Sequence, residues 1–79
     1  MSVTDTSSTQ SLSNCNIITI KNVGSATAYI SFSTSATTND FPLDADEELS
    51  IGIKNLAQVS AICSSDETTT LKIIAQDTW

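Results

Sequence analysis

The sequence predicts an all-β domain, a small antiparallel β-sandwich or open barrel of about five to seven short strands. Apolar residues alternate with polar ones over most of the chain, and polar turn residues interrupt the alternation about every eight to twelve positions. A spacing of two places apolar side chains on one face of a strand, whereas a helix needs a spacing of three or four. The 79 residues suffice for one small domain.

The expected strands begin at residue 16, and each has one apolar and one polar face. They cover residues 16–21, 26–34, 48–54, 56–63 and 71–75. Val59, Ala61 and Cys63 share one face of the fourth strand. A helix within residues 44–61 is the alternative, because Glu, Leu and Ala favour helices, but the spacing of two opposes it. The shared core is expected to contain Ile18, Ile20, Ile30, Phe32, Leu49, Ile51, Leu71 and Ile73.

Polar segments between these strands predict turns. Gly24 is expected to supply the positive φ of a hairpin turn at residues 22–25. Pro42 fixes its own φ and keeps Phe41 extended at the end of a loop, residues 35–42, that is expected to span the two sheets. Further turns are expected at residues 44–47 and 64–67.

Residues 1–14 are predicted to form a flexible arm outside the domain, which then covers residues 15–79. After Met1 the arm contains only Val3 and Leu12 as apolar residues, too few to offset the entropy of ordering. A mobile terminus and a tether that orders on a neighbouring subunit are both compatible with this composition.

The charge balance limits the expected partners. Three lysines and nine acidic residues give a net charge of −6, the wrong sign for binding nucleic acid or an anionic membrane. No apolar run approaches the roughly 20 residues of a membrane-spanning helix, and the first residues lack the features of a signal peptide. We therefore expect synthesis in the cytoplasm. The acidic balance keeps a small protein soluble and also suits docking onto a basic protein surface, and composition does not distinguish these two roles.

The residue types argue against an enzyme and against a metal or cofactor. The chain has no histidine, so it lacks the usual general base and the commonest metal ligand. Cys15 and Cys63 are too far apart in sequence for a typical zinc or redox motif. If they pair, the disulfide would stabilise the fold by roughly 4 kcal/mol. Two buried free thiols are the alternative, which a reducing cytoplasm favours.

Two kinds of side chain are candidates for an interface. Asp44, Asp46 and Glu47 belong to an acidic run that can be a solvated loop, a docking patch or a calcium site, although its spacing fits no EF-hand. Tyr29, on a polar strand face, and Trp79, at the end of the chain, are the exposed aromatic candidates.

One stretch of the chain resembles a known group of proteins. The segment Phe41-Pro42-Leu43, the turn at residues 44–47 and the alternating strands after it are similar to small tailed-phage capsid auxiliary proteins: decoration, cement and head-fibre modules with a β-sandwich fold. Asp46 stands where those families often have glycine, and Asp tolerates the left-handed conformation that such a turn needs. The resemblance covers about residues 16–75 and carries over no functional residue.

The resemblance implies a virion structural protein. It would be a decoration or cement protein on the capsid exterior, bound to the major capsid protein or other virion subunits, and such families are often trimers. A homo-oligomer is expected independently, because a core this small is marginal and strand edges need covering. The alternative is a receptor- or carbohydrate-binding tip module of a phage fibre or another adhesion protein, suggested by Tyr29, Trp79 and the hydroxyl-rich residues 31–38.

Overall fold

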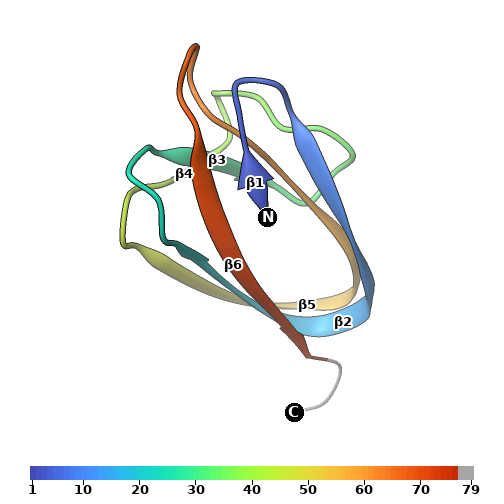
Figure 1. Cartoon of the computed structure of the whole chain (residues 1–79). Coiled ribbons are helices and arrows are strands. Elements are labelled where there is room, and N and C mark those ends of the chain that lie inside the picture. The colour runs from blue at the N-terminus through green and yellow to red at the C-terminus, as the bar shows by residue number, and fades with distance from the viewer. Residues whose placement is uncertain (77–79) are drawn as a thin grey trace.

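The computed structural model describes residues 1–76, apart from the side chains of residues 13–15 and 53–55. This part of the chain consists of strands and turns and contains no helix (Figure 1). It is therefore without a helix that could cross a membrane. The strands are β1 (Ser2–Val3), β2 (Ser8–Asn22), β3 (Ala28–Ser31), β4 (Phe41–Leu43), β5 (Glu48–Ile62) and β6 (Thr69–Gln76).

Two antiparallel sheets of four strands each form the fold, and the long strands β2 and β5 belong to both. Residues 8–11 of β2 pair with residues 58–61 of β5, and β3 and β4 continue this β3 sheet. Residues 17–21 pair with residues 48–52, and this β6 sheet continues beyond β2 with β6 and β1. The pairing register shifts between the two halves, where β2 and β5 bend together at one end of the molecule (Figure 1). The expected antiparallel sandwich is confirmed.

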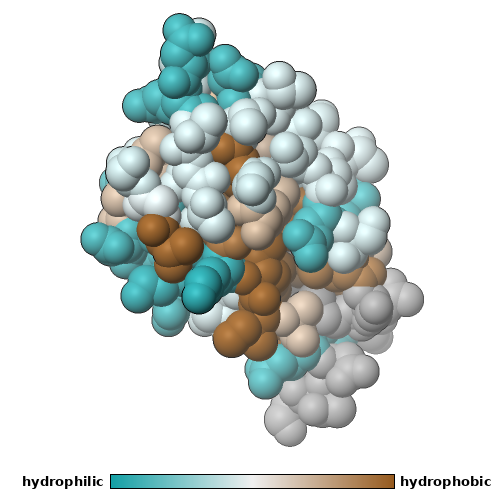
Figure 2. All heavy atoms as spheres, in the orientation of Figure 1, coloured by the Kyte–Doolittle hydropathy of each residue, from teal (hydrophilic) through white to brown (hydrophobic). Residues whose placement is uncertain are grey.

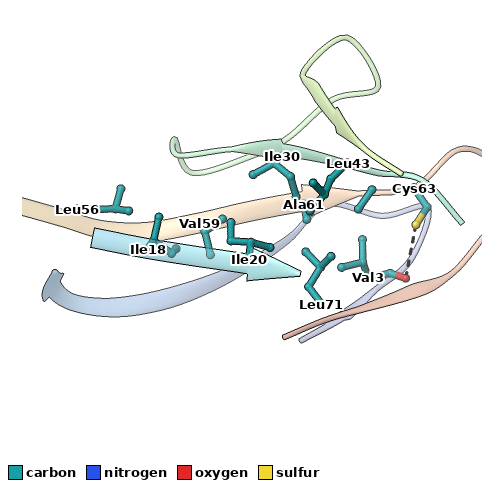
Figure 3. Packing of buried hydrophobic residues seen from close by; sticks show 11 residues of the cluster. Val3, Ile18, Ile20, Ile30, Leu43, Leu56, Val59, Ala61, Cys63 and Leu71 are labelled. Carbon is teal, nitrogen blue, oxygen red and sulfur yellow. Dashed lines mark hydrogen bonds between the residues drawn. The ribbon is translucent and has the colours of Figure 1, made fainter. Parts of the chain in front are cut away.

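The core lies between the sheets and follows the predicted alternation (Figure 3). Of the eight predicted core residues, Ile18, Ile20, Ile30 and Leu71 are buried. Phe32, Leu49, Ile51 and Ile73 are partly buried and pack against these residues. Val59, Ala61 and Cys63 are also buried, as the expected shared face requires. The register deduced from the sequence is therefore correct.

The flexible arm expected at residues 1–14 is corrected by the structure. Val3 is buried in the core, β1 pairs with β6, and β2 begins at Ser8. The main chain of Met1 exchanges hydrogen bonds with Leu71 on β6, and the amide of Cys63 donates to the carbonyl of Thr4. Ladder bonds depend little on side-chain polarity, so a Ser/Thr-rich segment can complete a sheet. The domain therefore starts before residue 15.

The loop after β3 also differs from expectation. β3 ends at Ser31 rather than at residue 34, and the following segment lies on the outer face of the β3 sheet instead of spanning the two sheets. The Ser60 hydroxyl donates to the carbonyl of Ser33 at 2.7 Å, and the Thr9 hydroxyl donates to the carbonyl of Thr34 at 2.9 Å. The amide of Ala36 donates to the Ser7 hydroxyl. Hydroxyls on the outer face thus hold residues 33–36 over β2 and β5.

Asn22, at the end of β2, is a buried polar residue that joins four segments. Its Nδ2 donates to the carbonyls of Ala26 at 2.7 Å and Leu43 at 2.8 Å. Its Oδ1 accepts from the hydroxyl of Thr69 at 2.7 Å and from the amide of Gly24 at 3.1 Å. All the amide's hydrogen-bonding capacity is therefore used inside the protein, which removes the cost of burying it.

Two aspartates adopt the left-handed conformation in turns. Asp46 has φ 65° and Asp66 has φ 64°, so the expectation that Asp46 takes the left-handed conformation is confirmed. Gly24 does not have a positive φ, contrary to expectation. A Cβ on Gly24 would clash with the Thr69 hydroxyl and lie 2.8 Å from the Thr70 nitrogen. The glycine is needed for close approach to β6, not for its φ.

We expect Gly24→Ala to destabilise the protein by about 1–3 kcal/mol, because the backbone of β6 cannot yield to the added methyl group. Gly52→Ala is the matched control: Gly52 is exposed and has no positive φ, so the same change should be neutral or slightly stabilising. Urea denaturation of both variants measures the difference. Equal stabilities would contradict the role assigned to Gly24.

Candidate interaction surface

Three side chains form a row across the outer face of the β3 sheet. Tyr29 on β3 lies opposite Pro42 on β4 and opposite Ile62 on β5. Because Ala28 and Ile30 point into the core, Tyr29 points outward. Tyr29 and Ile62 are partly exposed and Pro42 is exposed. We call these three residues the Tyr29 row.

The acidic turn lies directly beside this row. The Thr27 hydroxyl donates to Asp44 Oδ1 at 2.7 Å, which holds Asp44 next to the start of β3. Within the turn, the Asp44 amide donates to Glu47 Oε1 at 2.8 Å and the Glu47 amide to the carbonyl of Asp44 at 3.0 Å. Asp46, with its left-handed backbone, is exposed at the tip. Two of the three carboxylates therefore order the turn and also give it negative charge.

The structure thus brings four of the five predicted interface residues to one place: Tyr29, Asp44, Asp46 and Glu47. The fifth, Trp79, lies outside the described residues. Nothing in the sequence pattern marks Pro42 or Ile62 as interface residues, because their position beside Tyr29 depends on strand pairing. Residues 33–36 cover the β2 side of the same outer face, so the open part of this face lies over β3 and β4.

The outer face of the opposite sheet carries two lysines. Lys21 and Lys72 lie opposite each other on its outer face, both exposed, and Lys21 is also opposite Glu48. Negative charge therefore lies beside the Tyr29 row, whereas these two lysines lie on the other sheet.

Viewed from the side of β6, apolar residues form a band through the middle of the molecule, with polar residues around it (Figure 2).

Two carboxylates of the acidic run, those of Asp40 and Glu47, each accept a hydrogen bond within their own turn. Asp40 Oδ2 accepts from the amide of Thr37 at 2.7 Å, just as Glu47 Oε1 accepts from the amide of Asp44. No group of three or more potential ligands suited to a metal ion occurs in the part of the chain that the structure describes. The side-chain contacts that are present order the two turns.

Cys63 is a buried free thiol. Its Sγ–H donates to the carbonyl of Val3 at 3.8 Å (Figure 3). The structure therefore has no disulfide at Cys63; the side chain of Cys15, its proposed partner, lies outside the described residues. Burial raises the pKa of the Cys63 thiol, and the nearby negative charges of Glu67 and Asp5 raise it further.

This shift predicts a loss of stability at alkaline pH. In the unfolded chain the thiol ionises near its ordinary pKa of about 8.5, whereas in the folded protein it stays neutral to higher pH. The unfolded state is then stabilised as pH rises above about 8.5, so the free energy of unfolding falls. We expect the stability advantage of the wild type over Cys63→Ala to shrink between about pH 8 and pH 10. An advantage that is constant or grows with pH would contradict this.

The fold and this surface define a class, a small antiparallel β-sandwich with an aromatic and acidic outer face. Comparisons with protein-family models, curated proteins and solved structures found no match to this chain.

Proposed function

We propose that this protein is a virion structural protein, a decoration protein that binds the outer surface of a phage head and stabilises it. The observation that carries the proposal is the Tyr29 row on the β3 sheet, with the acidic turn beside it. Tyr side chains lose little conformational entropy on binding and often dominate interface energetics. Adjacent carboxylates speed association with a basic surface and orient it. The surface thus has the composition of a docking site for a protein partner.

In this proposal the Tyr29 row contacts the major capsid protein and the acidic turn faces basic residues around the contact. The two lysines on the other sheet then point away from the capsid. Salt should slow association, because exposed charges are screened within about 10 Å at 0.1 M ionic strength.

The first experiment locates the protein by mass spectrometry of purified phage particles from cells that express the gene. We expect a fixed copy number per particle that survives gradient purification. Particles that lack the protein should bind purified chain and should withstand heat or chelator better once they have done so. Absence from purified particles would contradict the proposal.

The second experiment tests the surface. Tyr29→Ala should weaken binding to such particles by at least about 30-fold, the effect of losing a central aromatic contact. Asp46→Asn should weaken it about two- to fivefold, mainly through slower association at low salt. Asp66→Asn is the matched control, because Asp66 has the same left-handed backbone but lies in a different turn. It should bind like the wild type.

A carbohydrate-binding role is the second candidate, since Asp44 lies beside an aromatic residue that a sugar ring could stack on. NMR titration with a panel of oligosaccharides distinguishes the two functions. Chemical-shift changes confined to Tyr29 and Asp44, together with unchanged particle binding by Tyr29→Ala, would favour the adhesion module over the capsid protein.

A further inference from the structure

The two sheets have four edges, and three of them are short, contain proline or lysine, or are covered by a loop of the same chain. β1 has two residues and pairs only with the start of β6, so residues 72–76 of β6 also pair on one side only within the described residues, but that stretch contains Lys72. β4 has three residues, including Pro42, which cannot donate a hydrogen bond. Residues 8–11 of β2 are crossed by residues 33–36, which bond to Ser7 and Thr9. The fourth edge is the half of β5 at residues 48–52, which in the described chain pairs on one side only, with β2. This edge contains no proline or lysine, and its one charged residue is Glu48, at its first position.

The pairing pattern shows which backbone groups face outward along this edge. The Asn22 amide donates to the carbonyl of Glu47. Hydrogen-bonded and non-hydrogen-bonded pairs alternate along an antiparallel ladder, so Leu49 and Ile51 bond to β2. The main-chain N–H and C=O groups of Glu48, Ser50 and Gly52 therefore point away from the sheet.

We infer that a second copy of the chain adds to this edge, with residues 48–52 of the two copies antiparallel about a twofold axis at Ser50. In this register Ser50 exchanges two hydrogen bonds with Ser50 of the second copy. Glu48 lies opposite Gly52 of the second copy, so the two carboxylates are separated. If the register shifted by two residues, so that the twofold axis lay at Leu49, the two Glu48 carboxylates would be closer. A shift by four would place the axis at Glu48 and the two carboxylates directly opposite each other, which is unfavourable.

Side chains on the core side of the edge support the same pairing. Leu49 and Ile51 are only partly buried, and Leu49 would lie opposite Ile51 of the second copy. β4 is the edge strand of the other sheet, and the acidic turn connects it to residues 48–52. Phe41, on β4, is an apolar side chain that is 56% exposed. Pairing would extend the core across the two copies and join two four-stranded β6 sheets into one continuous sheet.

This pair is independent of the proposed capsid function and differs from the trimer that the resemblance implies. A twofold pair uses the same edge on both copies and closes at two subunits. The Tyr29 row lies on the other sheet, so both copies would keep it exposed.

Sedimentation equilibrium from about 10 µM to about 1 mM tests the pair, a range suited to weak association. The wild type should show a monomer–dimer equilibrium. Ser50→Pro should raise the dissociation constant at least tenfold, because it removes both central hydrogen bonds of the pair. Ser50→Ala is the matched control, since both changes remove the 3.0 Å hydroxyl contact with Thr19 but alanine keeps the N–H. It should dimerise like the wild type. A monomeric wild type at 1 mM, or a trimer insensitive to Ser50→Pro, would overturn the inference.

A charge series tests the register even where Ser50→Pro fails to fold. Gly52→Glu places a second carboxylate opposite Glu48 and should raise the dissociation constant about two- to thirtyfold, counting both symmetric sites. Gly52→Lys should lower it by a similar factor, and 0.5 M NaCl should reduce the difference. Equal constants for the two variants at low salt would exclude this pairing.

Discussion

Replacing Ile20 by alanine is expected to lower the free energy of unfolding by about 2–5 kcal/mol. Ile20 is fully buried, and its neighbours across the ladder are Leu49 and Ile73. Removing its side-chain carbons loses burial and leaves a cavity that flanking strands cannot close. A domain of 79 residues has only about 4–12 kcal/mol of total stability, so the variant should be close to unfolding at room temperature.

Ile74→Ala is the matched control, the same chemical change on the neighbouring strand. Ile74 is 61% exposed on the outer face of the β6 sheet, so its truncation should cost under about 0.5 kcal/mol. Urea denaturation followed by circular dichroism measures both. A larger loss for Ile74→Ala than for Ile20→Ala would mean that the inward and outward faces of this sheet are interchanged.

Asn22→Asp is expected to destabilise the protein by about 3–5 kcal/mol at pH 7, although the two side chains have the same shape. The amide nitrogen donates to two carbonyl oxygens, and a carboxylate in its place would repel both. Burial and this repulsion raise the pKa of the introduced carboxyl above the unfolded value of about 3.9. The penalty is therefore complete above the raised pKa, declines as pH falls through it, and is smallest below about pH 3.9, where the carboxyl is mostly protonated in both states.

The comparison with wild type is made at each pH, so that other titrations cancel. Asn39→Asp is the control, because Asn39 is exposed in a loop and should lose little stability at any pH. Thermal melts between pH 3 and pH 8 provide the measurement. An Asn22→Asp deficit that stays constant or grows as pH falls would show that the Asn22 amide does not donate to these carbonyls.

The faces of the strands could be predicted from the sequence because they depend on local alternation. Ile18 and Ile20 face the core and Thr19 lies between them on the outer side, as a period of two requires. The turn at Asp46 was equally local, because few residue types tolerate its backbone.

The placement of the N-terminal segment and of Gly24 could not be predicted in this way. The backbone of β1 is ordered by its ladder with β6, about 70 residues later in sequence, and composition carries no signal of that pairing. Gly24 is required because β6 passes close to it, which again depends on a distant segment. Asn22 looked like a turn residue, yet its four hydrogen bonds reach as far as Thr69.

In the candidate surface, too, some features depend on neighbouring residues and others on distant segments of the chain. The sequence by itself determined that Tyr29 points away from the core and that the turn after β4 is acidic, because both depend on neighbouring residues. Only the tertiary structure decided that these features adjoin, that Pro42 and Ile62 complete the row, and that residues 33–36 leave this part of the face open. Strand order and loop placement depend on the burial and hydrogen bonding of the whole chain, so they cannot be deduced from a short stretch of sequence.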